Sequence, residues 1–557
     1  MKNQPKSKPK IKIRAERIDH LGMVATTIKQ LGIQAFFDKK IPKKSQHHVT
    51  NGQVVSAMIL IGLGYVHRAL HITPRFLKGL CLERLIGEGV KANHFNDDVM
   101  GRCLDRIYEA GPTELFLELF ISILPQVSRG EDMRFHVDTT SMSVYSQQTN
   151  ETNPDDGNDG QEPAVIQLTR GLSKDNHPEL NQFLISLVTN QHGIPCYFES
   201  ISGNQSDKKN LIETIKQTVK GIQSNLKAHQ KALYIADSAV YTKANIGVMG
   251  SKTLFISRAP ATIQFVKQLT EAELDFTPCS QEGYRLYRTQ TDYGGVAQTA
   301  LVVESQAMKK RQHKQFDQKR DKHKQTAEKE LRKLCRQKFY CSQDARNELE
   351  RFQQEHPLFT VTLEDIEEKR ERTDGKRGKP VEDTPMRRTF QLKASLTYNE
   401  QAVAQKLEQM GRFVLVTNDT AMDEETILTY YKEQSQVEKG FRFLKDPVFE
   451  VDNVFLKSPK RIMALSMIMV LSLLVYNFLD RELIHKVREQ DAVIHGAENR
   501  ILKRPTMRAI FILFHGITKP YLIQDDHEQA CEMDGMEEEK LWHILEILGE
   551  DFVNMYQ

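Results

Sequence analysis

Strand-like apolar runs alternate with helical segments between residues 133 and 261, and this order limits the possible folds more than any other feature. The order is strand, hairpin, helix, strand, helix, strand, with the hairpin turning at Asn190–Gly193. The first strand is expected to end at Asp138. Such alternation is typical of a mixed sheet with helices packed against it. The sequence therefore predicts an α/β fold.

Two of the predicted strands carry an aspartate at their ends. Asp138 follows the apolar run Phe135–Val137, and Asp237 follows "ALYIA". An isolated buried carboxylate is costly, so each aspartate needs a lysine, a hydrogen-bond network or a metal ion. His136 shares a strand face with Asp138, because alternate residues point the same way. A role as a further ligand or as a ligand support, and a role as a core histidine, are both open for His136.

A third carboxylate lies on a predicted helix that runs from Thr429 up to Pro447. On a helical wheel with Tyr431 at zero, Gln434 falls at about 300°, Glu438 at about 340° and Lys445 at about 320°. One interpretation is a surface helix with an unrelated carboxylate. The other is that three carboxylates converge at the edge of the sheet and hold magnesium, which prefers oxygen ligands. Two such ions about 4 Å apart assist phosphodiester displacement.

The chain is long enough for several domains. Helical patterns between residues 17 and 128 predict helices that either bind DNA or only pack together. We divide the sequence into a basic tail (1–16), a helical N-terminal domain (17–128), a first core part (129–261), an inserted strand-rich and charged helical subdomain (262–415), a second core part with the Glu438 helix (416–485) and a C-terminal helical region (486–557).

Charge and cysteine usage restrict the class of protein only weakly. The net charge is +3, but the N-terminus and the stretch after Met308 are strongly basic. These runs indicate either a polyanionic partner or solvated faces. The 7 cysteines include no CxxC pair, so neither a zinc site nor a disulfide framework is expected. No signal peptide is expected, and Ile462–Leu479 is interpreted as a buried core helix rather than a membrane span.

The ordered set of motifs resembles the DDE transposases of bacterial insertion sequences, over roughly residues 17 to 480. The first acid matches Asp138 in "HVDTTS", the second Asp237 in "YIADSAVY" and the third Glu438. The stretches "GLSKDNHPELNQ", "SGNQSD" and "FNDDVMGRCLDRIYE" also resemble parts of these proteins.

The resemblance is narrower for the group with a Tyr-Arg-Glu-Lys signature and an insertion before the glutamate. Here the signature positions hold Tyr431, Gln434, Glu438 and Lys445, so glutamine replaces the arginine. Arg442 lies near the same helix face and is a candidate to supply the missing charge. By this resemblance, Tyr431, Gln434, Arg442 and Lys445 are expected to contact DNA.

The resemblance implies a ribonuclease-H-like mixed sheet flanked by helices, with a helical, DNA-binding N-terminal domain and an inserted α+β subdomain. It implies that Asp138, Asp237 and Glu438 hold two Mg²⁺ ions, which Mn²⁺ can replace, and cleave DNA at transposon ends before strand transfer. The expected partners are terminal inverted repeats, target DNA and a second copy of the chain in a synaptic homodimer. The expected location is the cytoplasm, at the nucleoid, without a membrane.

Three other functions remain open from the sequence. A nuclease of the same fold would lack terminal inverted repeats around its gene. An inactive, transposase-derived DNA-binding protein would bind DNA without cleaving it. A membrane-associated protein built on Ile462–Leu479 would require detergent for solubility.

Overall fold

The computed structural model describes residues 11–43, 47–64, 73–144, 165–170, 179–204, 207–226, 231–250, 253–372, 386–434, 440, 443, 458–524 and 527–557.

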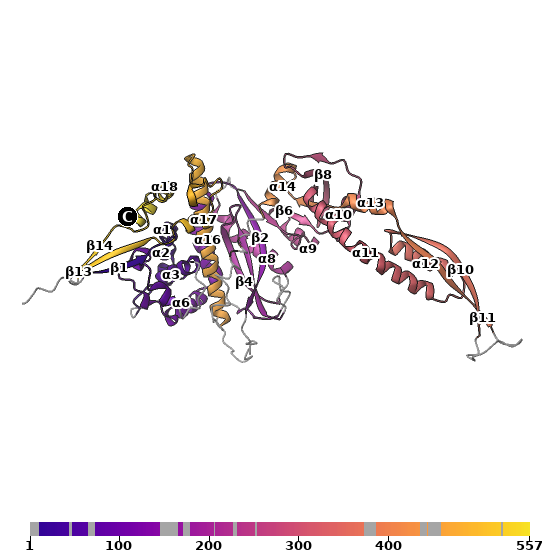
Figure 1. The fold of residues 1–557 in the computed structure, drawn as a ribbon, viewed down its shortest axis with the longest axis horizontal. Coiled ribbons are helices and arrows are strands. Elements are labelled where there is room, and N and C mark those ends of the chain that lie inside the picture. The colour runs from indigo at the N-terminus through magenta and orange to yellow at the C-terminus, as the bar shows by residue number, and fades with distance from the viewer. Residues whose placement is uncertain are drawn as a thin grey trace, which may run out of the picture.

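A nine-stranded mixed sheet forms the middle of the molecule, with strand order β4-β3-β2-β5-β6-β12-β9-β8-β7 (Figure 1). In its first half, β2, β3 and β4 are antiparallel, whereas β5 and β6 run parallel to β2. The predicted α/β class and the order of elements in this half are confirmed. The elements are β2 (Met133–Val144), β3 (Asn181–Thr189), β4 (Pro195–Ser202), α8 (Asp207–Ile222), β5 (Ala232–Ala236), α9 (Lys243–Met249) and β6 (Leu254–Ala259).

Strand β2 is longer than predicted. Its pairing with β5 stops at Val137, but its pairing with β3 continues to Val144. The prediction that the strand ends at Asp138 is therefore wrong. Residues 139–144 include two threonines and a valine, and β-branched side chains suit a paired strand even where the segment is not uniformly apolar.

The second half of the sheet comes from the segment that follows β6. Strand β12 pairs antiparallel with both β6 and β9, so it joins the two halves. Part of the predicted insertion thus extends the central sheet. These elements are α10 (Gln264–Glu271), β7 (Thr277–Pro278), β8 (Tyr284–Tyr293), β9 (Val296–Ser305) and β12 (Arg412–Thr417).

An arm projects from the sheet between β9 and β12 (Figure 1). It has its own hydrophobic core, in which Leu331, Leu349 and Leu392 are buried. Residues 367–372, a run of charged side chains, belong to β10, which pairs with β11 along its length. The arm contains α11 (Gln306–Arg336), α12 (Ser342–Glu355), β10 (Phe359–Arg372), β11 (Met386–Tyr398) and α13 (Glu400–Gln409).

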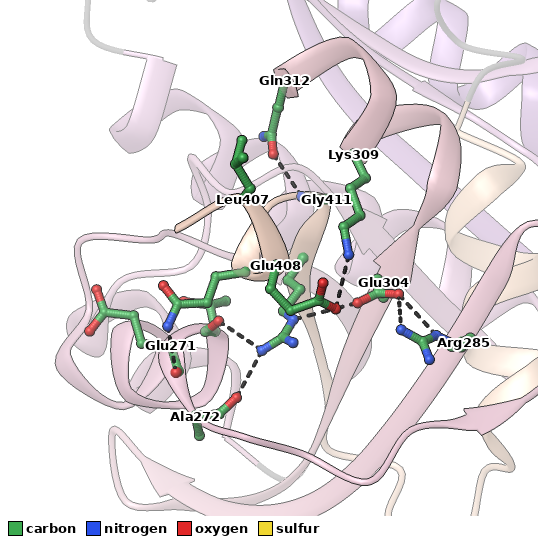
Figure 2. A network of polar contacts seen from close by, with 12 residues as sticks. Glu271, Ala272, Arg285, Glu304, Lys309, Gln312, Leu407, Glu408 and Gly411 are labelled. Atoms are coloured by element: carbon green, nitrogen blue, oxygen red, sulfur yellow. Dashed lines mark hydrogen bonds and ion pairs between the residues drawn. The ribbon is translucent and has the colours of Figure 1, made fainter. Parts of the chain in front are cut away.

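The arm leaves and re-enters the sheet at neighbouring positions. Glu304 at the end of β9 pairs with Arg412 at the start of β12, and the Ser305 amide donates to the Gly411 carbonyl at 2.9 Å. Figure 2 shows the polar network at this base, where Lys309 binds Glu408 at 3.0 Å and Arg285 binds the buried Glu304. The arm is therefore an insertion into a tight connection between two adjacent antiparallel strands.

Helices dominate the N-terminal region, as the sequence predicts. Helix α3 begins with a capping box in which Thr50 caps the helix and Gln53 completes the box. The helices are α1 (Leu21–Gln30), α2 (Ile33–Lys40), α3 (Asn51–Leu63), α4 (Thr73–Leu77), α5 (Leu82–Leu85), α6 (Asp97–Glu109) and α7 (Pro112–Ser128).

The two ends of the chain pack together. Residues 11–16, expected within a basic tail, belong to β1 (Ile11–Arg17), which pairs with β13 of the C-terminal region. The C-terminal region therefore contains a strand pair as well as helices. Its elements are α17 (Met507–Leu513), β13 (Thr518–Gln524), β14 (His527–Ala530), α18 (Glu539–Leu548) and α19 (Glu550–Tyr556).

Helix α16 (Pro459–Glu489) lies between the N-terminal helices and the sheet (Figure 1). It is the one helix in the described ranges that is long and apolar enough to cross a membrane, but 83% of its apolar window is buried inside the protein. Burial on this scale is what a core helix shows, so the interpretation of Ile462–Leu479 as a core helix agrees with the structure.

Candidate active site

The parallel pairing of β2 and β5 brings Asp138 and Asp237 to neighbouring positions. The last paired residues are Val137 and Ala236, and each aspartate directly follows one of them. Adjacent strands lie about 4.8 Å apart. The two aspartates therefore sit side by side where the strands separate, and β5 ends there in a turn in which the Val240 amide donates to the Asp237 carbonyl.

Both aspartates belong to the same face of the sheet. Along β5, Leu233 and Ile235 enter one hydrophobic cluster while Tyr234 enters another, so the side chains alternate between faces. The cluster with Leu233 and Ile235 also contains Ile427 and Leu428 of α14 (Glu424–Lys432). By alternation, Asp138 and Asp237 project from the face against which α14 packs.

The two carboxylates differ in exposure. Asp138 is half-buried and Asp237 is exposed. One oxygen of each accepts a hydrogen bond from the next backbone amide, from Thr139 at 2.7 Å and from Ser238 at 2.6 Å. The Asp237 Oδ2 atom makes no hydrogen bond to a residue that the structure describes. Two adjacent carboxylates, one of them open to solvent, offer the oxygen ligands that a hard cation such as Mg²⁺ prefers.

The third expected ligand belongs to a part of the chain that the structure does not describe. Glu438 lies outside the described residues, as do Arg442 and Lys445. Within the described ranges, no group of three His, Cys, Asp or Glu side chains is arranged to hold a metal ion.

Helix α14, which precedes Glu438 in the chain, is anchored on β2. Glu433 accepts two hydrogen bonds from the Arg134 guanidinium, at 2.8 and 3.0 Å, and the guanidinium lies 4.3 Å from the centre of the Tyr430 ring. The His136 Nε2 atom lies 3.8 Å from a Glu433 oxygen. Arg134, His136 and Asp138 alternate along β2, so the end of α14 is bound to the face that carries Asp138.

Burial and neighbouring charges determine the protonation states of His136 and Glu433. His136 is fully buried, and neither ring nitrogen makes a hydrogen bond to a described residue. Burial lowers the pKa of His136, although the Glu433 carboxylate acts in the opposite direction. Burial also raises the pKa of Glu433, but His136 and Arg134 together outweigh that effect and leave the pKa below its usual value. A neutral His136 beside an ionised Glu433 is therefore the stable state near neutral pH.

The signature residues that are described lie near the end of α14. Of the helix predicted from Thr429 up to Pro447, residues 429–432 form the end of α14, which starts earlier, at Glu424, and ends at Lys432. Gln434 lies in the turn that follows, so the assumption that it continues the same helix is wrong. The Tyr431 ring packs 6.3 Å from that of Phe413 on β12, between centroids, so Tyr431 is partly taken up by packing against the sheet.

Sequence reasoning missed Arg134 and Glu433. The only available signal was the position of Arg134 on the same strand face as Asp138. Nothing in the sequence pairs Arg134 with a glutamate almost 300 residues away, because that contact exists only once β5, β6 and β12 have formed the sheet beneath α14.

Comparison with known families agrees with this geometry. Residues 13–121 match a domain of unknown function (DUF4277), and residues 132–478 match the transposase DDE domain. A search of curated proteins returned no match. The boundary between the two matches falls near the junction of α7 and β2, where the helical region meets the sheet. Because the second match spans more than half of the 557 residues and contains both aspartates, the chain belongs to the transposase DDE domain family.

Proposed function

We propose that this transposase-family protein cleaves DNA at the ends of its own mobile element and joins the freed end to target DNA. The observation that carries the proposal is the register of β2 and β5, which sets Asp138 beside Asp237 on one face of the sheet. Glu438 is proposed as the third acid. In support, Glu433 holds the preceding helix on that same face, and only four residues separate Glu433 from Glu438.

The proposed cofactor is a pair of Mg²⁺ ions held by Asp138, Asp237 and Glu438, with Mn²⁺ as a substitute. Such a pair activates the attacking oxygen and stabilises the leaving oxygen of a phosphodiester displacement. The chain's own contribution is to fix the carboxylates, because backbone amides hold one oxygen of each aspartate. Water attacks a phosphodiester at the end of the element and its P–O3′ bond breaks, which frees a 3′-hydroxyl. That hydroxyl then attacks a phosphodiester of the target strand, so a new P–O bond forms as the target's own 3′-oxygen leaves.

DNA is the proposed partner, as terminal inverted repeats and as target. Tyr431, Gln434, Arg442 and Lys445 are proposed contacts, and phosphate contacts should make binding salt-dependent. The helical domain at residues 17–128 is proposed to bind DNA too. Joining two ends requires that two ends be held together, so a homodimer is proposed for the reaction, in the cytoplasm at the nucleoid.

The test uses the purified protein with DNA that flanks its own gene, in the presence of Mg²⁺ or Mn²⁺. We expect cleavage at a defined border, and we expect Asp138→Asn and Glu438→Gln to abolish cleavage while DNA binding remains. Asp292→Asn, an exposed change on β8, is the charge-matched control and should cleave normally.

Two results would count against the proposal. Border binding without cleavage by the wild-type protein favours an inactive, transposase-derived DNA-binding protein. Cleavage without preference for the borders, from a gene that lacks inverted repeats, favours a nuclease of the same fold.

A further inference from the structure

Helix α11 of the arm carries an unusual concentration of positive charge. It contains 12 Lys and Arg residues against 4 Asp and Glu residues, a net charge of +8 on 31 residues. Only Ala327, Leu331 and Leu334 of this helix are buried. Most of the surface of α11 therefore lacks the tertiary packing that usually stabilises a long helix.

The charge is concentrated on one side of the helix. On a wheel with Lys310 at zero, the arc from about 40° to about 180° contains eight basic residues and no acidic residue. The four acids fall outside this arc, at about 340°, 20°, 0° and 200°. We call these eight residues the basic stripe: Arg311, Lys314, Lys319, Lys322, Lys329, Arg332, Lys333 and Arg336.

The opposite face holds the helix in place. At the base of the arm, Lys309 pairs with Glu408, and the Gln312 side chain accepts from the Gly411 amide at 2.7 Å (Figure 2). Farther along, the Arg320 guanidinium lies 4.6 Å from the centre of the Tyr398 ring. Lys309, Gln312 and Arg320 fall between about 200° and 280° on the same wheel, away from the basic stripe. The stripe is thus fixed in orientation and directed outward.

The charges of the stripe are scarcely compensated within the protein. Among the residues that the structure describes, only Arg332 of the stripe forms an ion pair, with Glu328 one turn earlier on α11 at 3.4 Å. Every stripe residue is exposed. Like charges repeated along one face repel one another, so this surface is unfavourable unless an anion covers it.

We propose that the basic stripe binds the phosphate backbone of duplex DNA, at a surface separate from the aspartate pair. Arg311 to Arg336 spans about 38 Å at 1.5 Å per residue, which matches about one turn of B-DNA. The stripe has no acid to repel phosphates, and Gln318 and Gln325, which lie within the arc, can donate further hydrogen bonds to them. Contacts of this kind are independent of base sequence. The choice of DNA as occupant rests on the proposed function.

The experiment compares the full-length protein with a stripe variant, Arg311→Gln, Lys314→Gln, Lys322→Gln and Lys329→Gln. Glutamine has nearly the helix propensity of lysine and arginine, so α11 should persist. Binding to a random-sequence 30-base-pair duplex is measured by fluorescence anisotropy, without divalent metal, between 50 and 200 mM salt. Each phosphate contact contributes about 0.9 to the slope of log K against log salt, so we expect the slope to fall by up to about 3.6.

Two controls accompany the stripe variant. Arg500→Gln, Lys503→Gln, Arg504→Gln and Arg508→Gln remove the same charge from exposed positions outside the arm and should keep the wild-type slope. Exchanging lysine and arginine at the four stripe positions keeps the charge and should also keep the slope. Circular dichroism and thermal unfolding verify that each variant is folded.

The inference is overturned if the stripe variant binds with the wild-type slope. It is also overturned if the slope falls by the same amount in the control variant outside the arm. It is also overturned if the stripe variant changes the oligomeric state but not DNA binding, which would assign the stripe to a protein partner such as the acidic segment 531–539 of a second copy. Border cleavage tests the proposed function separately. A folded stripe variant with weaker random-duplex binding supports the stripe even if the wild-type protein cleaves no border.

Discussion

Arg134 and Glu433 form the contact that most directly links the described part of the aspartate site to the segment carrying Glu438. Their side chains are only 21% and 24% exposed, and two hydrogen bonds join them. A carboxylate left in such a place without its partner retains most of its desolvation cost. This pair should therefore matter more than the surface ion pairs of the molecule.

We expect Arg134→Gln to lower the free energy of unfolding by about 1–3 kcal/mol, and Glu433→Gln to have a similar effect. The double variant should cost less than the sum of the two, with a coupling of about 1 kcal/mol. Chemical denaturation of the wild-type protein, the two single variants and the double variant completes this double-mutant cycle. The exposed pair Arg102 and Asp98, treated in the same way, should show coupling below about 0.5 kcal/mol. Equal coupling in the two pairs would contradict the special role of Glu433.

His136 makes the stability of the protein depend on pH in a definable window. Its pKa in the folded protein is lowered from 6.5 by burial, so the unfolded chain takes up a proton first as the pH falls. The stability from a neutral, buried His136 is present above pH 6.5 and is lost as the pH falls toward the lowered pKa. The depressed pKa of Glu433 acts in a separate window, below its ordinary value of 4.5.

As the pH is lowered from 7.5 to 5, the midpoint temperature of thermal unfolding should therefore fall more steeply for the wild-type protein than for His136→Leu. His543→Leu, which removes an exposed histidine, is the matched control. Parallel curves for the wild-type protein and His136→Leu would show that His136 takes up no proton in this range.

Helix α16 shows at the scale of an element how burial resolves an ambiguous sequence. Leu474 is fully buried, whereas Arg488 near the end of the same helix is exposed. We expect Leu474→Ala to lower the free energy of unfolding by about 2–5 kcal/mol, because it leaves a cavity. Arg488→Ala should lower it by less than about 0.5 kcal/mol. Denaturant titration without detergent measures both. A Leu474→Ala variant as stable as the wild-type protein would argue against a core position.

The elements also show which predictions the sequence could support. The hairpin at Asn190–Gly193, the β5 strand and the position of Asp237 follow from local patterns, and all three are found. The length of β2 was mispredicted, because pairing with β3 decides it rather than local composition. The end of α14 was mispredicted too: there Glu433 binds Arg134 on β2, a distant contact that local composition does not encode. The contact between Arg134 and Glu433 could not be predicted, since no local pattern encodes it.

The whole molecule consists of a sheet-centred body and an arm that is folded around its own core. The ends of the arm meet at Ser305 and Gly411, which are hydrogen-bonded neighbours. Removing the arm should therefore leave the sheet able to form, because the strands on either side remain adjacent in the chain.

We expect a variant in which Asn–Gly replaces residues 306–410 to stay folded and soluble, because this dipeptide suits a two-residue hairpin turn between β9 and β12. The slope of its DNA binding against salt should fall at least as far as that of the stripe variant. Circular dichroism, size-exclusion chromatography and the anisotropy assay check these outcomes. Aggregation of the shortened protein would mean that the arm is required for the body to fold.

The pairing of β10 with β11 has a practical consequence. The two strands pair from Phe359 opposite Tyr398 to Arg372 opposite Met386, at the far end of the arm, with one register shift between Leu363 and Asp365. A break in the chain between residues 372 and 386 would give each fragment one strand of this pair and part of the surrounding core. Fragments 1–372 and 386–557, expressed together, should therefore reassemble by complementation. Because Asp138 and Asp237 lie in the first fragment and Glu438, the proposed third ligand, lies in the second, DNA cleavage would report directly on whether the two fragments have met.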